Sequence, residues 1–317
     1  MSVKPKHGAS WINLPSTVDK AADATVKCLL RAVPAAEDAG VEHRGGYDDR
    51  AGALRDMVQN RLVQLLCLVA MEPMASFDAD EIRNKKAGVL YAVRPIHPDT
   101  VHQCVARGQY AQGRVGGKKV PGYREGDGVS PDSQTETFVA LRLPLDHWRR
   151  QEAPFCLRTG KRLARQASEI AIRFRGVPHQ SFPPEASLDR QPSRLIISIH
   201  PDECIVLPFQ AKHPGSKMHL QTEEMKFSYQ EAFAARSPDA HETLLWDVMK
   251  NDAALSMRAD QIEAAWRLLT PVLEARAVAP PGDFPNDAAG TWGPEETPGV
   301  ACERTPSAAA HRIGRAP

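Results

Sequence analysis

The chain has 317 residues, of which 42% are hydrophobic and 25% are charged, and its formal net charge is +1 at pH 7. This near-neutral balance excludes the concentrated basic field that binding to nucleic acid or to an anionic membrane surface requires. The sequence has no apolar run of the ~20 residues that a membrane helix needs and no apolar leader, so we expect a cytoplasmic protein. Its 6 cysteines are scattered without a CxxC pair, which argues against a zinc site and against a disulfide framework.

Residues 1–34 carry little pattern, and we interpret them as a poorly ordered leader. Within them, residues 21–33 form a short amphipathic piece that is typical of a helix, and Pro34 ends it. The ordered part of the chain is therefore expected to begin near residue 35.

Residues 52–73 form the longest apolar-rich helix candidate. Its apolar side chains recur at the spacings of three, four and seven that place them on one helical stripe: Leu54, Met57, Val58, Leu65 and Leu68. From Leu62 onward little of the circumference is polar, so we place this helix at the centre of the fold. Arg61 falls on the same stripe, seven residues after Leu54, so its guanidinium must find an anionic partner or reach water.

The segment after this helix predicts a turn, a second helix that ends before Pro95, and a long ordered loop over residues 96–132. Five short β-branched or alternating runs follow, at residues 137–143, 168–174, 194–200, 203–209 and 218–229. Helices do not alternate with them, and the pair that flanks His200 is typical of a hairpin. We therefore expect a largely antiparallel sheet.

Two helices close the predicted domain. The first begins at Pro238 and has four apolar residues on one face: Leu244, Leu245, Val248 and Met249. The second spans residues 259–276 with apolar residues at helical spacing. The chain beyond Pro280 is rich in proline, glycine and alanine, and we expect residues 295–317 to form a disordered tail.

Four segments carry a family resemblance: GVEHRGGYDDRAGALRDMVQNRLVQLL, LRTGKRLARQASEI, AHETLLWDVMKND and RADQIEAAWRLLTPVL. They resemble the glucose-6-phosphate dehydrogenase family, and the resemblance extends from about residue 36 to residue 294. It implies that residues 35–294 form the family's C-terminal substrate and dimerisation domain. The implied fold class is α+β, with a large, mostly antiparallel sheet, helices packed on one face of it, and the N-terminal Rossmann domain absent.

The resemblance also assigns the reaction's base. In the family, the histidine of an RDxxQNH pattern is the catalytic base, and the aspartate of that pattern orients it. Asp56 matches the aspartate, but Arg61 stands where the histidine is expected. A guanidinium with a pKa above about 12 cannot accept a proton at neutral pH. Two roles remain open for Arg61: an ion pair with a nearby carboxylate, or a cation that attracts a sugar phosphate without reacting with it.

The implied substrate residues are partly substituted. Lys161, in RTGK, matches a family lysine that reaches the substrate, and Gln166 stands where the family has a second basic side chain. Glu37 matches a glutamate that hydrogen-bonds sugar hydroxyls, a task that Asp56 shares. His200 stands where a family glutamine faces the substrate. Without the resemblance, Lys161 is typical of a surface lysine and His200 of a structural histidine.

The resemblance implies NADP as the family's cofactor, yet no dinucleotide-binding signal accompanies it. The one tempting glycine cluster, GRVGG at residues 113–117, lies in a predicted loop with no strand before it. We therefore expect no cofactor to bind productively to this chain, and we expect no metal site.

The implied function is the oxidation of glucose 6-phosphate to 6-phosphogluconolactone with NADP, in the pentose phosphate pathway. Because the base and the nucleotide domain are missing, we expect a truncated form with little or no activity on its own. The alternative is a non-catalytic sugar-phosphate-binding or dimerisation module. The expected partners are weakly bound glucose 6-phosphate and either a second copy of the chain or a full-length paralogue, paired through the sheet.

Overall fold

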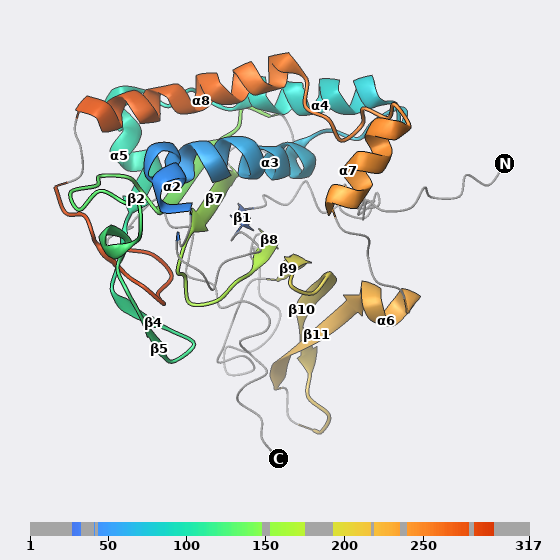
Figure 1. Ribbon diagram of the computed structural model, residues 1–317. Helices are drawn as coiled ribbons and strands as arrows, with labels where there is room; N and C mark the ends of the chain where they lie inside the picture. Colours follow the sequence, from blue (N-terminus) through green and yellow to red (C-terminus); the bar gives the residue numbers. More distant parts are fainter. Residues whose placement is uncertain are drawn as a thin grey trace.

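The computed structural model describes residues 27–32, 41, 44–147, 153–174, 193–216, 219–234, 240–278 and 282–294. They form an eight-stranded sheet with a layer of helices over one face (Figure 1). The strand order is β11-β10-β9-β8-β1-β7-β6-β2. The strands are β1 (Lys27–Ala32), β2 (Val105–Gly108), β6 (Phe138–Pro144), β7 (Pro154–Gly160), β8 (Ser168–Arg173), β9 (Arg194–His200), β10 (Cys204–Lys212) and β11 (Leu220–Ser228).

Neighbouring strands of this sheet are antiparallel, apart from β1 and β7, which are parallel. The expected α+β class, the largely antiparallel sheet and the hairpin at His200 are thereby confirmed, since β9 and β10 pair with Ile197 opposite Ile205. Smaller pairs join β3 (Tyr110–Ala111) to β12 (Asp287–Ala288) and β4 (Gly113–Val115) to β5 (Lys118–Val120).

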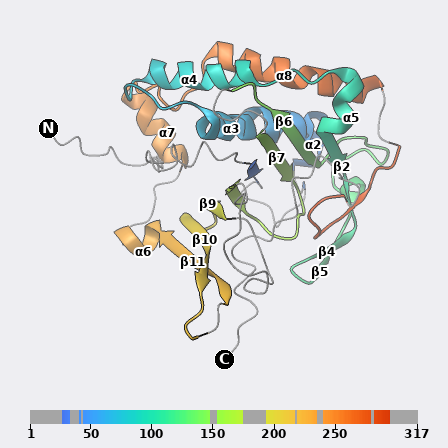
Figure 2. The ribbon, with the colours of Figure 1, turned by 180° about the vertical axis from the view of Figure 1, so that it is seen from behind.

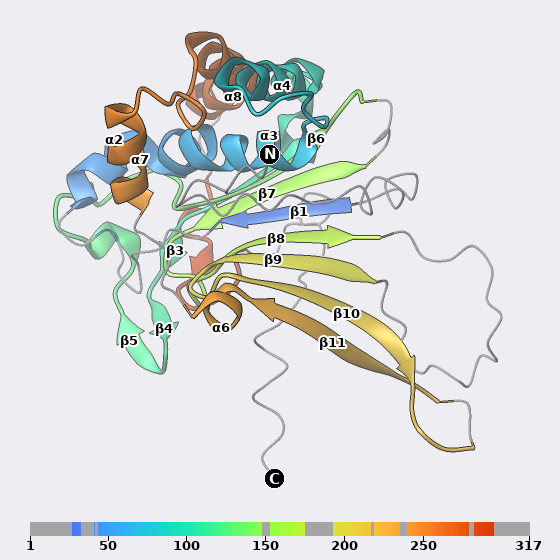
Figure 3. The same ribbon diagram turned by 90° about the vertical axis from the view of Figure 1, so that its right-hand side faces the viewer.

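The helices are stacked in two tiers above the sheet (Figures 2 and 3). The tier next to the strands is one run: α2 (Gly45–Ala53), η2 (Leu54–Leu62) and α3 (Val63–Ala70). The outer tier pairs α4 (Ala79–Ala92) with α8 (Ala259–Val278). The shorter helices are η3 (Pro98–Thr100), α5 (Val101–Cys104), η4 (Tyr123–Glu125), α6 (Tyr229–Phe233) and α7 (Ala240–Met249).

The inner helical run lies at the centre of the fold, as predicted. Its apolar side chains are fully buried: Leu54, Val58, Leu62, Val63, Leu66 and Cys67. They belong to one core cluster with Leu141 and Leu157 of the sheet and with Leu268 and Leu269 of α8. A helix enclosed between strands and other helices has no solvent side, and this explains why residues 62–70 are apolar nearly all round.

The middle of this run is a π-helix, which overturns part of the predicted stripe. The Val63 N–H bonds to the Val58 carbonyl, five residues back, as π-winding requires. The spacing of four that places Arg61 beside Leu65 holds for an α-helix, so it fails across this segment. Arg61 is exposed, while Leu65 and Leu68 are only half-buried. The prediction that Arg61 lies on the apolar stripe is therefore wrong.

The structure corrects three further expectations. Residues 27–32 form strand β1 between β7 and β8, so the helix predicted over residues 21–33 is wrong there. The loop predicted over residues 96–132 contains several short elements, including β2 on the sheet edge. Cys156 is disulfide-bonded, whereas Cys67, Cys104 and Cys204 are free thiols.

The remaining parts of the domain prediction fall outside this description. Residues 1–26, 33–34 and 295–317 lie outside the described residues, so the leader and tail expected there stay predictions. The boundary at residue 35 also stays a prediction, and β1 lies before it. The five predicted strands and both closing helices are present, with ends that differ by a few residues from those expected.

Candidate functional site

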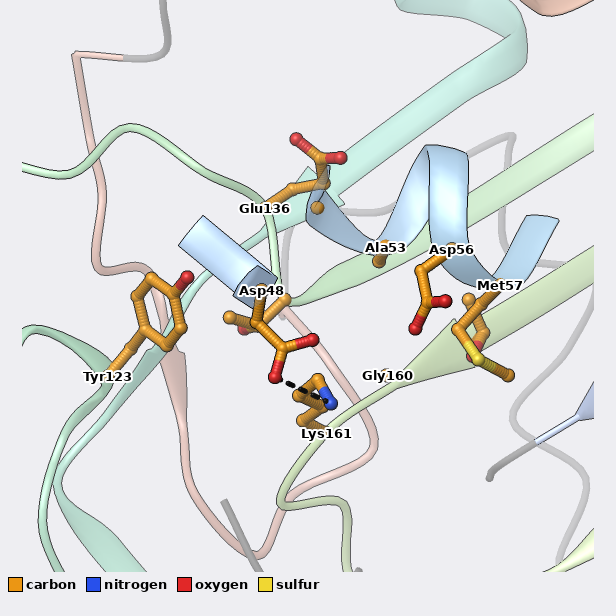
Figure 4. Close-up of a pocket in the computed structure, with 11 residues that line it drawn as sticks. Asp48, Ala53, Asp56, Met57, Tyr123, Glu136, Gly160 and Lys161 are labelled. Atoms are coloured by element: carbon orange, nitrogen blue, oxygen red, sulfur yellow. Dashed lines mark ion pairs between the residues drawn. The ribbon is translucent and has the colours of Figure 1, made fainter. Parts of the chain in front are cut away.

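A pocket lies where the inner helical run breaks, above the end of β7 (Figure 4). Its lining comes from α2, η2, η4, the residues just before β6, the end of β7 and the residue that follows it. The charged side chains that line it are Asp48, Asp56, Glu136 and Lys161. The site therefore gathers residues that are more than 100 positions apart in the sequence.

Gly52 and Glu136 create the break. Gly52 has φ +71° and ψ 167°, so it interrupts the helix in a conformation that favours glycine. The main-chain oxygen of Glu136 accepts the Ala53 N–H at 3.1 Å, and its Oε1 accepts the Leu54 N–H at 3.1 Å. A Cβ atom on Gly52 would lie 2.5 Å from that Oε1 atom, so only glycine fits. The main-chain carbonyl and the buried carboxylate of Glu136 thus each satisfy one N–H group that the break leaves open.

Asp56 lies in η2 and lines the pocket. Its Oδ1 accepts a hydrogen bond from the Tyr47 hydroxyl at 3.4 Å, and the Arg44 guanidinium carbon lies 5.1 Å from the centre of the Tyr47 ring. Sequence patterns do not reveal the Tyr47 contact, because Tyr47 and Asp56 stand nine residues apart across a break.

Arg61 does not line this pocket. It lies in η2, five residues after Asp56, and its side chain is exposed. Across the described ranges, Arg61 forms no ion pair with a carboxylate. Of the two roles left open by the sequence, the ion pair therefore finds no support among these residues.

Lys161 directly follows β7, and its side chain is only 10% exposed. Its backbone N–H donates to the Thr137 carbonyl at 3.0 Å, and its Nζ lies 3.5 Å from Oδ2 of the buried Asp48. Figure 4 shows the two side chains pointing toward one another from α2 and from the end of β7. A lysine this buried differs from the surface lysine that the sequence alone would suggest.

The next acidic residue, Asp49, anchors α2 to the segment before β6. It accepts a hydrogen bond from the Tyr123 hydroxyl at 3.1 Å and another from the Ser133 hydroxyl. Burial raises the pKa of Tyr123 well above its usual range, and the nearby Asp49 charge adds to the effect, so the phenol remains a donor. Thr135 Oγ1 also donates to the Asp49 carbonyl at 2.6 Å. Sequence patterns did not reveal this network, because the partners lie more than 70 residues apart.

The other predicted substrate residues are not brought together here. Gln166 and His200 are described but do not line the pocket, and Glu37 lies outside the described residues. His200 ends β9, opposite Ser168. Arg165, the neighbour of Gln166, lies 3.6 Å from Glu169. Asp56 and Lys161 are thus the two predicted site residues that share the pocket, and the roles of all six stay predictions.

The glycine cluster at residues 113–117 forms the β4–β5 hairpin, with Gly116 and Gly117 at positive φ in its turn. The chain continues into β5 rather than into a helix, so this cluster offers no helix N-terminus to a pyrophosphate.

Among the helices that the structure describes, none has the length and apolarity needed to cross a membrane.

Comparison with known proteins identifies the family. The model of the glucose-6-phosphate dehydrogenase C-terminal domain matches residues 31–305. The glucose-6-phosphate 1-dehydrogenase of Mycolicibacterium smegmatis is 45% identical over 264 residues, which are 83% of this chain and 52% of that protein. That of Rhizobium meliloti is 43% identical over 268 residues, 84% of this chain and 54% of that protein. The chain spans about half the length of the curated relatives it matches.

Comparison with solved structures points to the same family. A glucose-6-phosphate dehydrogenase in complex with its substrate glucose-6-phosphate has a TM-score of 0.73 and 30% identity, covering 94% of this chain and 57% of its own. The glucose-6-phosphate 1-dehydrogenase of Mycobacterium avium has a TM-score of 0.71 and 33% identity, covering 89% of this chain and 56% of its own. The sheet, the covering helices and the matched sequence therefore lead to one conclusion: this chain belongs to the glucose-6-phosphate dehydrogenase family and carries its C-terminal domain.

Proposed function

We propose that this chain binds glucose 6-phosphate in the pocket below η2 and does not by itself oxidise it. The observation that carries the proposal is the meeting of Asp56 and Lys161 in one pocket, while Arg61 stands at the position that the resemblance gives to the base. The Lys161 ammonium would attract the phosphate, and the Asp56 carboxylate would accept hydrogen bonds from sugar hydroxyls.

The oxidation of glucose 6-phosphate to 6-phosphogluconolactone, which the family resemblance implies, requires a group that takes the proton of the reacting hydroxyl. An arginine side chain carries N–H donors and no acceptor, so Arg61 cannot take that proton. The exposed Arg61 cation can still attract the phosphate electrostatically. We therefore expect the chain to bind glucose 6-phosphate without oxidising it.

The family uses NADP, and the described residues do not fit that cofactor. The glycine cluster at residues 113–117 forms a hairpin turn, whereas a pyrophosphate is held where a strand and a glycine turn lead into a helix. NADP in this proposal therefore does not bind productively to the chain alone. A cytoplasmic location, which the family relationship favours, is part of the same proposal.

Titration calorimetry of the purified chain with glucose 6-phosphate tests the proposal. We expect weak binding that Lys161→Gln abolishes and Asp56→Asn weakens, and no reduction of NADP above background when both substrates are present. The exposed Lys118→Gln, in the β4–β5 hairpin, is the matched control and should bind like the unaltered chain. Turnover above background, or binding that ignores Lys161→Gln, would overturn the proposal.

A second candidate function is pairing through the sheet, with another copy or with a full-length paralogue. It is supported by apolar side chains that β11 and α6 leave uncovered: Met225 is 56% exposed, Phe227 40% and Phe233 65%. Met225 and Phe227 are two residues apart and so face the same side of β11. Figure 3 shows β10 and β11 extending away from the helical layer.

Light scattering after size-exclusion chromatography tests this pairing. We expect a dimer that the double variant Met225→Lys, Phe227→Lys converts to a monomer. Tyr91→Lys provides the matched control, because Tyr91 is 60% exposed on α4, in the outer tier of helices. A monomer in the unaltered chain, or a dimer that survives the double variant, would count against the sheet as the interface.

A further inference from the structure

Asp48 forms an ion pair with Lys161, and Lys161 is the cation that the phosphate of the proposed ligand needs. Asp48 Oδ2 lies 3.5 Å from Lys161 Nζ, and the two side chains are 6% and 10% exposed. Both line the pocket, and Figure 4 places the Asp56 carboxyl group beside them. A buried pair of this kind is screened little by solvent, so its charges act strongly on anything that enters.

The charge balance of the lining is acidic. It contains three carboxylates, those of Asp48, Asp56 and Glu136, and one cation, Lys161. Glu136 is balanced from outside the lining, because its Oε2 lies 2.7 Å from the guanidinium of Arg276. Within the lining, Lys161 is thus the cation that lies with Asp48 and Asp56. A phosphate that approaches Lys161 meets the competing Asp48 carboxylate and repulsion from both acidic groups.

Asp48 cannot easily withdraw from Lys161. Its neighbour Asp49 is held by the hydroxyls of Tyr123 and Ser133, which fixes this turn of α2 against the segment before β6. Earlier in α2, a Cβ atom on Gly45 would lie 2.0 Å from the Asp127 carbonyl oxygen, so the helix is packed tightly there as well. The backbone that carries Asp48 is therefore held in place, and the carboxylate can leave Lys161 only by rotation of its own buried side chain.

We propose that Asp48 determines the ligand specificity of this pocket: it takes the place on Lys161 that a phosphate would occupy and so disfavours doubly charged sugar phosphates. This inference rests on the proposed function, since it concerns affinity at the same site. Asp48 lies before the RDxxQNH pattern. The inference makes this residue the cause of the weak glucose 6-phosphate binding that we expect. Removing the charge of Asp48 should take away the carboxylate that competes with the phosphate for Lys161.

Calorimetric titrations with glucose 6-phosphate and with inorganic phosphate test the proposal on the full chain. Asp48→Asn keeps the shape of the side chain and should tighten the binding of both ligands by roughly tenfold, the effect of one weak charge interaction removed from the pocket. In Asp48→Asn, Lys161→Gln the gain should vanish. Asp56→Asn removes the same charge from the lining without touching Lys161, so it should give no comparable gain.

The outcomes separate the two proposals. If the unaltered chain binds through Lys161 but Asp48→Asn binds no more tightly, this inference fails and the proposed function stands. A gain that persists in the double variant, or that Asp56→Asn reproduces, also overturns it, because the effect would then be one of total charge. If no variant binds either ligand, both proposals fail. Asp48→Ser, which also removes the charge, is measured in parallel so that misfolding of one variant does not decide the result.

Discussion

The Glu136 carboxylate lies 2.7 Å from the guanidinium of Arg276, with the Glu136 side chain fully buried and that of Arg276 18% exposed. The same carboxylate accepts the N–H of Leu54 at the start of η2. Arg276 also donates to Thr135 Oγ1 at 3.1 Å. One ion pair therefore connects the end of α8, the approach to β6 and the break that shapes the pocket.

Removing Arg276 should destabilise the protein severely. Arg276→Ala removes the guanidinium paired with the buried Glu136 carboxylate and leaves Arg107 as a nearby charge, and breaking such a buried pair costs about 3–5 kcal/mol. Urea denaturation monitored by circular dichroism measures the loss. The pair of Arg94 and Asp146 is the control, because it has the same 2.7 Å separation but side chains 58% and 59% exposed. Arg94→Ala should cost no more than about 1 kcal/mol, and an equal loss in both variants would contradict the role of burial.

Replacing Gly52 by alanine should lower the free energy of unfolding, whereas replacing Gly88 by alanine should raise it. Gly52→Ala forces a side chain into positive φ and against Glu136 Oε1, so we expect a loss of at least about 1–2 kcal/mol in the free energy of unfolding. Gly88 lies within α4 with nothing within 4 Å of an added Cβ, so Gly88→Ala should stabilise by about 0.5–1 kcal/mol. Equilibrium unfolding of both variants checks the pair, and a stable Gly52→Ala protein would show that the break is not required.

The raised pKa of the Cys67 thiol predicts that the free energy of unfolding falls at alkaline pH. Burial raises its pKa from 9.0 to about 12, and the nearby Lys86 charge offsets part of that rise. Between these values the unfolded chain has lost the thiol proton while the folded protein keeps it, so stability is fully present below pH 9 and falls as pH rises toward 12. The slope approaches about 1.4 kcal/mol per pH unit.

Urea denaturation at pH 8, 9 and 10 on the unaltered chain and on Cys67→Ala measures this contribution. The unaltered chain should lose stability more steeply with pH than the variant, and the difference between the two isolates Cys67 from other titrating groups. Parallel pH profiles would mean that Cys67 does not carry a raised pKa.

Restoring a histidine should not restore catalysis. Arg61→His supplies a group that can accept a proton, but it does not supply a hydride acceptor, and the glycine cluster at residues 113–117 forms a hairpin turn rather than a pyrophosphate-binding turn. We expect NADP reduction by Arg61→His to stay at background, while glucose 6-phosphate binding measured by calorimetry persists. Turnover in this variant would reveal a cofactor site that the described residues do not include.

Much of the fold was predictable from local pattern. The strands at residues 194–200 and 203–209 were recognised because β-branched residues alternate and Pro201 interrupts them. β7 was missed, although Pro154–Gly160 is buried at every position, because a strand buried on both faces does not alternate. β1 was missed for a related reason: its strand conformation is fixed by pairing with β7 and β8, which lie far away in the sequence.

The features of the candidate site also fall into those that the sequence predicts and those that only the tertiary structure decides. By itself, the sequence determined the family, the α+β class, the central helical run, and the presence of Asp56, Arg61 and Lys161, because these depend on residue types and spacing along the chain. Only the tertiary structure decided that Arg61 faces outward and that Asp48 reaches Lys161. The physical reason is that a π-turn and a glycine break reset the helical period at Leu54, and Glu136 and Arg276 hold that break from positions more than 80 residues away.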